Sequence, residues 1–203
     1  MNKIEKEPSH TYTSVAESVF QVERSAWNNC ANFIDDNRNI GNPFLSHEFF
    51  SCLEESGSVS KETGWISQHI LLFEEGNSLI GILPNYLKNH SWGEYIFDQV
   101  FANAWENAGG KYYPKLLSAI PFSPVAGERF LIKKGYSRKF VIEKLLDALE
   151  DLKKFYKVSS AHINFINEPQ LKIALKNKFW FERNNIQFHW RNQNYENFEH
   201  FLS

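Results

Sequence analysis

The chain has 203 residues, of which 42% are hydrophobic and 23% are charged, and its formal net charge at pH 7 is −2. These values are typical of a globular protein with a sizeable core and exclude a long low-complexity chain. The small negative charge provides no basic surface, so we expect no nucleic-acid partner.

The sequence favours a cytoplasmic protein without a bound metal. No apolar run approaches the ~20 residues of a transmembrane helix, and the N-terminus, MNKIEKEPSH, lacks the core of a signal peptide. Cys30 and Cys52 have neither metal-ligand spacing nor a disulfide framework, and we interpret both as reduced structural thiols. The histidines show no HExxH or comparable spacing, so we predict no metal site.

Hydrophobic periodicity predicts an alternating series of strands and helices after a flexible tail at residues 1–12. The expected strands cover residues 13–22, 66–74, 79–87, 116–120, 159–165 and 179–191, and the expected helices cover 25–36, 46–57, 91–109, 138–156, 168–176 and 196–202. Because a hairpin lies near the front of this series, we predict an α/β fold: a mixed β-sheet flanked by helices, as one domain over residues 13–203.

The stretch 84–115 concentrates the candidate reactive groups. Ser91 and Glu94 have the spacing of a capping box, and a helix is expected from there to Gly109. Glu94 and Asp98 would lie one turn apart, where repulsion and partial burial favour a raised pKa for one of them. The alternative is that Glu94 caps the helix and Asp98 favours the positive end of its dipole. The apolar arc expected to pack on the core consists of Phe97, Val100, Phe101, Ala104, Trp105 and Ala108.

Four positions outside this stretch are candidate ligand contacts. Arg138 stands at the start of a long helix, where free N–H groups and the dipole could attract an anion. His162 and His189 are either structural histidines or point from neighbouring strands into one polar cleft. His47, in the first turn of a helix, is either a solvated residue or a ligand contact.

Seven strings carry a family resemblance, namely NPFLSHEFF (42–50), TGW (63–65), LPNYLKNHSWGEYIFD (83–98), AGGKYYPKL (108–116), PFSPVAGERFL (121–131), SSAHINF (159–165) and QFHWRN (187–192). In this order and spacing they are similar to strings of the FemAB-like family. Its members are predicted N-acyltransferases of the GNAT superfamily, described as peptidoglycan biosynthesis or recognition proteins. The element order also resembles the GNAT fold, in which two helices follow the first strand. The resemblance covers the chain from about residue 13.

The resemblance implies a transferase that moves an acyl or aminoacyl group onto an amine. The implied donor is acyl-CoA or aminoacyl-tRNA, and the implied acceptor is a small-molecule or peptide amine. Full-length members have two tandem GNAT-like halves, and this sequence matches the first, so a separately encoded second half is an expected partner. The positions inside the matching strings that can ionise or donate are Lys88, His90, Glu94, Asp98, Tyr113, Lys115 and His189.

The chemistry of acyl transfer suggests roles for these residues. The reaction needs a neutral amine, a nearby base or water relay, and donors at the developing oxyanion. We assign the base to Glu94 or Asp98 and the proton relay to His90 or Tyr113. The candidate substrate-binding residues are Lys88, Lys115, His189 and Arg138.

Two other classes of function fit the same sequence. The 18 Phe, 8 Tyr and 6 Trp are either large core residues or a flat platform for a sugar ring. The second alternative would make the chain a non-catalytic module that binds cell-wall peptide or glycan. A third reading is a structural half that needs a partner chain. No GxSxG motif is present, which argues against a serine hydrolase of that class.

Overall fold

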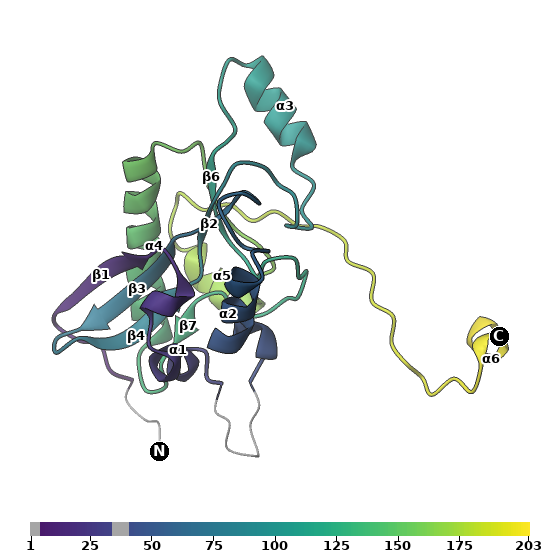
Figure 1. Cartoon of the computed structure of the whole chain (residues 1–203), viewed down its shortest axis with the longest axis horizontal. Coiled ribbons are helices and arrows are strands. Elements are labelled where there is room, and N and C mark those ends of the chain that lie inside the picture. The colour runs from purple at the N-terminus through teal and green to yellow at the C-terminus, as the bar shows by residue number, and fades with distance from the viewer. Residues whose placement is uncertain (1–4, 34–40) are drawn as a thin grey trace.

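The computed structural model describes residues 5–33 and 41–203, so the last three residues of the helix expected over 25–36 lie outside the described residues (Figure 1). The strands are β1 (Thr11–Ala16), β2 (Trp65–Ser67), β3 (His69–Glu74), β4 (Ser78–Leu83), β5 (Tyr86–Lys88), β6 (Lys115–Ser118), β7 (Leu131–Ile132) and β8 (Ala161–Ile163). The α-helices are α1 (Arg24–Cys30), α2 (His47–Glu55), α3 (Gln99–Asn107), α4 (Arg138–Tyr156), α5 (Glu168–Ala174) and α6 (Phe198–Leu202), and two 3-10 turns are η1 (Val19–Gln21) and η2 (Pro43–Leu45).

The described strands form two four-stranded sheets, ordered β1-β3-β4-β7 and β2-β5-β6-β8, rather than one continuous sheet. All pairs are antiparallel except β6–β8, so the second sheet is mixed. The chain passes between the sheets at Gln68 and again at Pro84-Asn85, where the expected long strands divide. Pro84 has no N–H to donate to a neighbouring strand. The Gln68 N–H donates to the Asn85 carbonyl at 2.8 Å, so the two points at which the chain changes sheet are hydrogen-bonded to each other.

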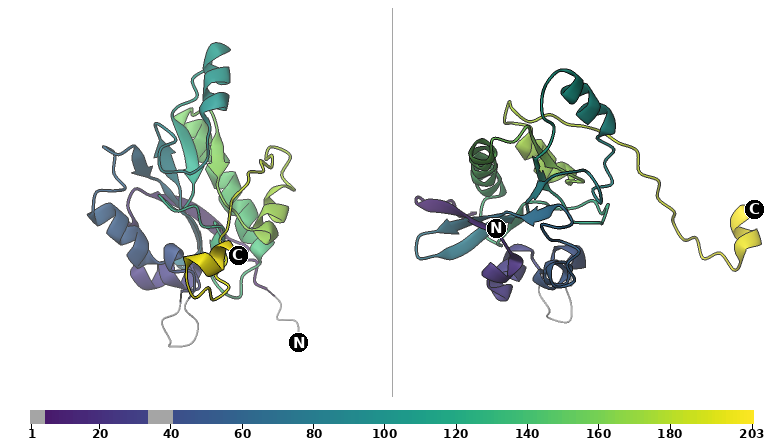
Figure 2. Two further views of the ribbon diagram at one scale, coloured as in Figure 1. Left: turned by 90° about the vertical axis from the view of Figure 1, so that its right-hand side faces the viewer. Right: turned by 45° about the horizontal axis from the view of Figure 1, so that its top comes forward.

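Helices cover both faces of the first sheet, as the α/β prediction requires (Figure 2). Successive residues of β3 point to opposite faces: Ile70 packs with α4, and Leu71 packs with the cluster that contains α1 and α2. Gly81 on β4 allows the close approach of α4, because a Cβ there would lie 2.5 Å from a methyl group of Val141. The bounds predicted for α4 are confirmed, and Ser137 caps it by accepting from the Phe140 N–H.

The N-terminal strand begins and ends earlier than predicted. Thr11 pairs with Glu74 and Ala16 with His69, so the strand starts inside the expected tail. The chain then turns at Ser18, which caps η1 instead of continuing the strand to residue 22. Before the strand, the Lys6 N–H donates to the backbone of the β7–α4 turn at 2.8 Å.

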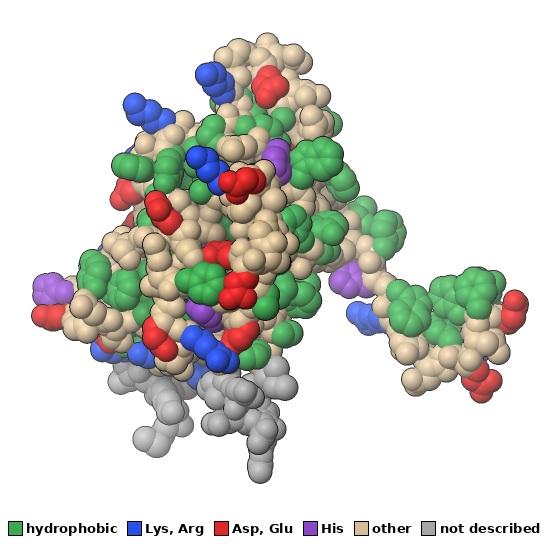
Figure 3. Space-filling view, viewed as in Figure 1, with side chains coloured by type: hydrophobic (Ala, Val, Ile, Leu, Met, Phe, Trp, Pro, Cys, Tyr) green, Lys and Arg blue, Asp and Glu red, His purple; other side chains and the backbone are tan. Residues whose placement is uncertain are grey.

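The strand expected over residues 179–191 is not observed. This segment leaves the body as an extended chain and ends in α6, away from both sheets (Figure 1). Ile186, Phe188 and Trp190 alternate as in a strand, yet they are 80%, 94% and 65% exposed because no neighbouring strand pairs with them. In the space-filling view this end is a separate lobe with apolar side chains on its surface (Figure 3). Within the described residues, no helix is both long and apolar enough to cross a bilayer.

Candidate functional site

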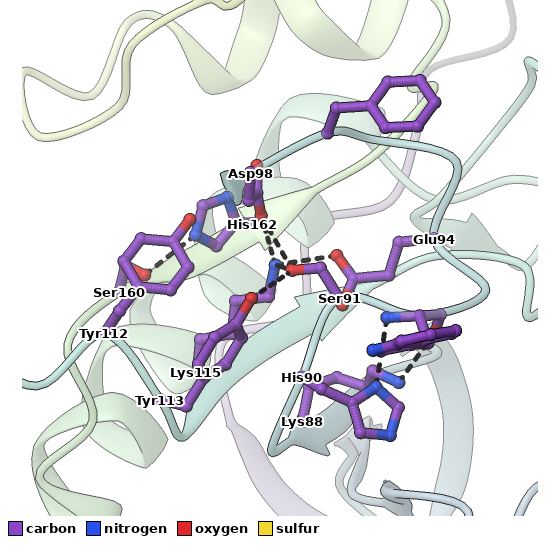
Figure 4. Close-up of polar contacts among 12 residues, drawn as sticks. Lys88, His90, Ser91, Glu94, Asp98, Tyr112, Tyr113, Lys115, Ser160 and His162 are labelled. Carbon is purple, nitrogen blue, oxygen red and sulfur yellow. Dashed lines mark hydrogen bonds and ion pairs between the residues drawn. The ribbon is translucent and has the colours of Figure 1, made fainter. Parts of the chain in front are cut away.

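Lys115, the first residue of β6, is at the centre of a buried polar cluster (Figure 4). Its Nζ donates to Ser91 Oγ at 2.9 Å, to Glu94 Oε2 at 2.7 Å and to Asp98 Oδ2 at 2.5 Å. The side chains of Lys115, Glu94 and Asp98 are fully buried. We call Ser91, Glu94, Asp98 and Lys115 the Lys115 cluster.

The loop between β5 and α3 brings these acceptors to the ammonium. The predicted capping box is wrong: α3 begins at Gln99, and the Ser91 and Glu94 side chains bind Lys115 instead of backbone N–H groups. Asp98 occupies the cap position without a side-chain cap hydrogen bond. Burying a charged ammonium without acceptors costs more free energy than leaving a helix end without a side-chain cap, because water can solvate the helix end. The hydrogen bonds to Lys115 are also charge-assisted and therefore stronger than those of a cap.

The apolar arc of α3 is also placed differently from its prediction. Phe97 and Val100 are 82% and 76% exposed, and Phe101 and Trp105 are more than half exposed. Helix α3 stands away from the two sheets at the top of Figure 1, so the described body does not cover this face.

Asp98 is held in its ionised form. Its Oδ1 accepts from Arg183 Nη1 at 2.7 Å, and its Oδ2 accepts from Lys115. Burial alone would raise the pKa of Asp98, but the hydrogen bond and charge of Lys115, with the Arg183 contact, outweigh burial and lower the pKa to about 2. Asp98 is therefore a permanent counter-charge at neutral pH.

Glu94 has a different environment. One carboxylate oxygen accepts from Lys115, and the other, Oε1, is buried and has no hydrogen-bond partner in the described chain. Burial raises the pKa of Glu94, and the Lys115 charge offsets only part of that effect. The two carboxylates therefore differ in pKa: that of Asp98 is lowered, and that of Glu94 is raised above its ordinary value.

Tyr113 and His162 border the cluster. The Tyr113 hydroxyl lies 2.8 Å from Ser91 Oγ, which links it to Lys115 through two successive hydrogen bonds. His162, on β8, hydrogen-bonds to Ser160 Oγ at 2.8 Å. Burial and the nearby Lys115 charge lower the pKa of His162 to about 4, so its ring is neutral at pH 7.

Lys88 lies beside the cluster, opposite Lys115 in the β5–β6 register. It is fully buried, its Nζ lies 3.6 Å from the centre of the Trp65 ring, and it donates to the Trp92 carbonyl at 3.3 Å. Burial lowers the pKa of Lys88 to about 7, with the Lys115 charge acting in the same direction against the attraction of Glu94.

His90 is held apart from the carboxylates. Its Nδ1 accepts from the Trp92 N–H at 3.1 Å, so Nε2 carries the proton and donates to the Thr63 carbonyl at 3.0 Å. Both ring nitrogens are engaged. Of the two candidate relays, only Tyr113 is hydrogen-bonded to a member of the Lys115 cluster.

Three further candidates lie outside the cluster. His189 is exposed in the extended C-terminal segment and contacts Gln187. Arg138 pairs with Glu128 at 2.9 Å. The solvated interpretation of His47 is wrong: its ring is buried and its Nε2 lies 3.2 Å from each of two backbone carbonyls.

The structure adds Arg183 to the region, and it places Tyr112, one of the candidate groups of the stretch 84–115, at its border. Arg183 is far from Asp98 in sequence and lies in the predicted strand 179–191, which does not form. Local spacing therefore does not predict its contact with Asp98. Tyr112 packs its ring against Tyr113 and lies 5.7 Å from Lys115 Nζ. The two cysteines are free, and Cys52 is exposed where a buried structural thiol was expected. Residues 5–33 and 41–203 contain no group of three potential metal ligands.

Comparison with known proteins identifies the family and the fold. The family model for FemAB-like proteins, described as peptidoglycan biosynthesis/recognition, matches residues 18–203, and the chain belongs to this family. No curated protein matches the chain.

The fold is that of GNAT acetyltransferases. A probable acetyltransferase is 11% identical with a TM-score of 0.50, over 91% of this chain and 99% of that one. An aminoglycoside N-acetyltransferase, AAC(6')-Iy, in complex with CoA is 10% identical with a TM-score of 0.50, over 92% and 97%. AAC(6')-Ih from Acinetobacter baumannii is 10% identical with a TM-score of 0.45, over 90% and 99%.

Proposed function

We propose that this chain is an N-acyltransferase domain that transfers an acyl or aminoacyl group to an amine in peptidoglycan-related metabolism. Membership of the FemAB-like family and the GNAT fold support the general activity. The observation that carries the proposal is Glu94, whose buried carboxylate is held through one oxygen while the other has no partner. Such an oxygen can accept a proton from an amine.

In the proposed reaction, the acceptor nitrogen attacks the acyl carbonyl, a C–N bond forms, and the bond from that carbon to the leaving group breaks. Glu94 accepts the proton that the nitrogen loses and returns one proton to the leaving group, so the carboxylate is regenerated. Lys115 holds the Glu94 carboxylate in place, and Asp98 balances the ammonium. The hydroxyls of Ser91 and Tyr113 extend the hydrogen-bonded path away from Lys115.

Substrate must reach a carboxylate that is covered in the present structure. The covering loop runs over residues 91–98, and its outward side chains include Trp92, Tyr95 and Phe97, all more than half exposed. The Tyr95 and Phe97 side chains are exposed, so we propose that the part of the loop between Glu94 and Asp98 moves to admit the amine. Trp92 and Gly93 would keep their hydrogen bonds to His90 and Phe122.

The donor in this proposal is acyl-CoA or aminoacyl-tRNA. The AAC(6')-Iy structure contains CoA, which makes acyl-CoA the first donor to test. The start of α4 does not fit a pyrophosphate: the Ser137 N–H donates to the Lys6 carbonyl at 3.0 Å, and the Arg138 guanidinium is paired with Glu128. We therefore assign no phosphate contact to Arg138. Arg183 contacts Asp98 of the Lys115 cluster, and Lys88 lies opposite Lys115 in the β5–β6 register.

We also propose that the domain works together with a second GNAT-like half. The support is the uncovered apolar surface: the outer face of α3 and the C-terminal segment expose large hydrophobic side chains that a folded neighbour would cover. These side chains are Phe97, Val100, Phe101, Trp105, Phe179, Phe181, Ile186, Phe188, Trp190, Phe198, Phe201 and Leu202.

A thiol-release assay with acetyl-CoA and a panel of small amines, including glucosamine and a lysine-containing peptide, tests the activity. We expect amine-dependent thiol release by the wild-type chain. Glu94→Gln should lower the rate by about 10²–10⁴-fold, the usual contribution of a general base. Glu106→Gln, on the exposed side of α3, is the matched control and should leave the rate unchanged. Equal rates for the wild type and Glu94→Gln would remove the base assignment.

A second candidate function is non-catalytic recognition of cell-wall glycan. A pocket lined by three aromatic side chains, Trp65, Trp92 and Phe122, favours it. Glycan binding without thiol release from acetyl-CoA by any amine in the panel would select this candidate over the transferase.

A further inference from the structure

Lys88 and Lys115 are two buried lysines with unequal surroundings. They lie directly opposite each other in the β5–β6 register, which places their Cβ atoms about 5 Å apart on one face of the sheet. Neither side chain is exposed. An ammonium has three N–H donors, and Lys115 donates all three to the other members of the Lys115 cluster (Figure 4). Lys115 is therefore a fully hydrogen-bonded ammonium.

Lys88 has acceptors for only two N–H groups. Its Nζ donates to the Trp92 carbonyl at 3.3 Å and lies 3.6 Å from the centre of the Trp65 ring, whose π face accepts a second N–H. Within the described residues the two carboxylates of the region pair with Lys115, and none pairs with Lys88. An ammonium at this position would keep one N–H unpaired, whereas a neutral amine has both N–H groups paired and its lone pair free. The geometry therefore favours the neutral amine.

Burial and a neighbouring cation both act toward the neutral form of Lys88. Burial lowers the pKa of Lys88 to about 7, and the Lys115 charge opposes the attraction of Glu94. About half of the Lys88 side chains are therefore uncharged at pH 7, against about one in 3,000 for a lysine with the ordinary pKa of 10.5. Desolvation and a second cationic group are two ways in which proteins make a lysine nucleophilic.

The two residues that Lys88 Nζ contacts, Trp65 and Trp92, both line a pocket of about 270 Å³. The other lining residues are Ser58, Thr63, His90 and Phe122. The Trp92 side chain is 79% exposed, so its rotation would open this wall toward the amine with little loss of packing. The volume is below the usual range for a drug-sized ligand, and it therefore suits a small acyl group rather than a whole donor molecule.

We infer that Lys88 is a nucleophilic amine that takes up an acyl group from an activated acyl carbonyl, either a thioester or an ester. The lone pair of Nζ attacks the carbonyl carbon, an N–C bond forms, and the bond from that carbon to sulfur or oxygen breaks. The proton that Nζ loses goes to the departing thiolate or alkoxide, so the products are an amide on Lys88 and a free thiol or alcohol. The inference does not rest on the proposed function, because the reaction with an ester needs neither CoA nor an acceptor amine.

Mass spectrometry that measures acetylation at each lysine of the full chain tests the inference at pH 7. One arm uses p-nitrophenyl acetate and the other uses acetyl-CoA, both without an added amine. Acetyl-Lys88 should form at least about tenfold faster than acetyl-Lys111, an exposed control, because its larger uncharged fraction outweighs its lower intrinsic nucleophilicity. Lys115, the buried control, should stay unmodified. In urea, where the chain is unfolded, the three lysines should react at equal rates.

The pH dependence of labelling separates a neutral amine from a lysine that is only accessible. The rate at Lys88 should level off above about pH 8, whereas the rate at Lys111 should still rise at about pH 9. Lys88→Arg should remove the fast acetylation and leave the labelling of Lys111 unchanged.

The inference is overturned if both reagents leave Lys88 unmodified, if Lys88 and Lys115 are labelled equally, or if the ratio of Lys88 to Lys111 labelling is the same in the folded and unfolded chain. Labelling by p-nitrophenyl acetate alone would support the nucleophilic amine and identify esters as its acyl source. Because no acceptor amine is present, failure here is distinct from failure of the amine-dependent acyltransferase assay.

Discussion

Glu94 and Asp98 illustrate how two carboxylates on one loop acquire different chemistry. Both are fully buried and both bind the same ammonium. Asp98 has a second cationic partner, Arg183, whereas the second oxygen of Glu94 has none. The local sequence predicts a pair with unequal pKa values, but it does not say which pKa rises, because Arg183 arrives from a distant segment.

Removing the negative charge of Asp98 should reduce stability more than removing that of Glu94. Asp98→Asn leaves Arg183 without its ion-pair partner and Lys115 with one carboxylate, so we expect a loss of about 3 kcal/mol in the free energy of unfolding. Glu94→Gln leaves both cations paired with Asp98 and should cost less. Urea denaturation at pH 7 measures both values, and equal losses would contradict the assigned roles.

Lys88 should make stability rise with pH. Its folded-state pKa is about 7, against an ordinary value of 10.5. Between these values the unfolded chain binds a proton that the folded chain does not. The free energy of unfolding should therefore increase by up to about 1.4 kcal/mol per pH unit above pH 7, and level off above the unfolded pKa.

Lys88→Met should flatten this dependence, while Lys111→Met, at an exposed position, should retain it. Urea titrations at pH 7, 8 and 9 provide the comparison. If the free energy of unfolding of Lys88→Met still rises with pH as in the wild type, the assignment of the lowered pKa to Lys88 is wrong.

At the scale of elements, helices α4 and α3 show where periodicity succeeds and where it fails. The apolar stripe of α4 packs on the first sheet, so the predicted helix and its bounds are both confirmed. The stripe of α3 is equally clear in the sequence, yet most of its large side chains are exposed. Periodicity identifies which residues share a face, but it does not identify what covers that face.

The two helices should respond differently to loss of apolar groups. Leu145→Ala in α4 removes fully buried methyl groups and should cost about 2–5 kcal/mol. Val100→Ser on the outer face of α3 should change the free energy of unfolding by less than about 0.5 kcal/mol. Chemical denaturation compares the two, and a large loss for Val100→Ser would show that α3 packs on the body in solution.

At the scale of the whole molecule, the class of fold follows from the order of elements, but the division into two sheets does not. That division depends on Gln68, which looks like an ordinary interior position of a strand, and on Pro84-Asn85. The proline there predicts an edge or a bulge, but not a change of sheet. The Lys115 cluster was predicted in part because Glu94, Asp98 and Lys115 are close in sequence. Arg183 was missed because only the tertiary fold brings it near.

The C-terminal segment should contribute little to the stability of the body. Arg183 and Gln187 attach it, and the side chains beyond them are exposed except for the half-buried Tyr195. Deletion of residues 188–203 should therefore leave the free energy of unfolding unchanged within about 0.5 kcal/mol. Chymotrypsin should cleave the intact chain first near Phe188 and Trp190. Protection of these sites, with a marked loss of stability on deletion, would show that the segment folds back on the domain.

The separate titration of Glu94 and Asp98 is the central claim. Side-chain carboxyl carbons, observed by NMR between pH 2 and 8 with Glu94→Gln and Asp98→Asn for assignment, measure it without any choice of donor or acceptor. We predict that Asp98 stays ionised down to about pH 2 and that Glu94 takes up its proton above its ordinary value of 4.5. A Glu94 carboxyl that titrates at or below 4.5 would contradict its role as the proton acceptor.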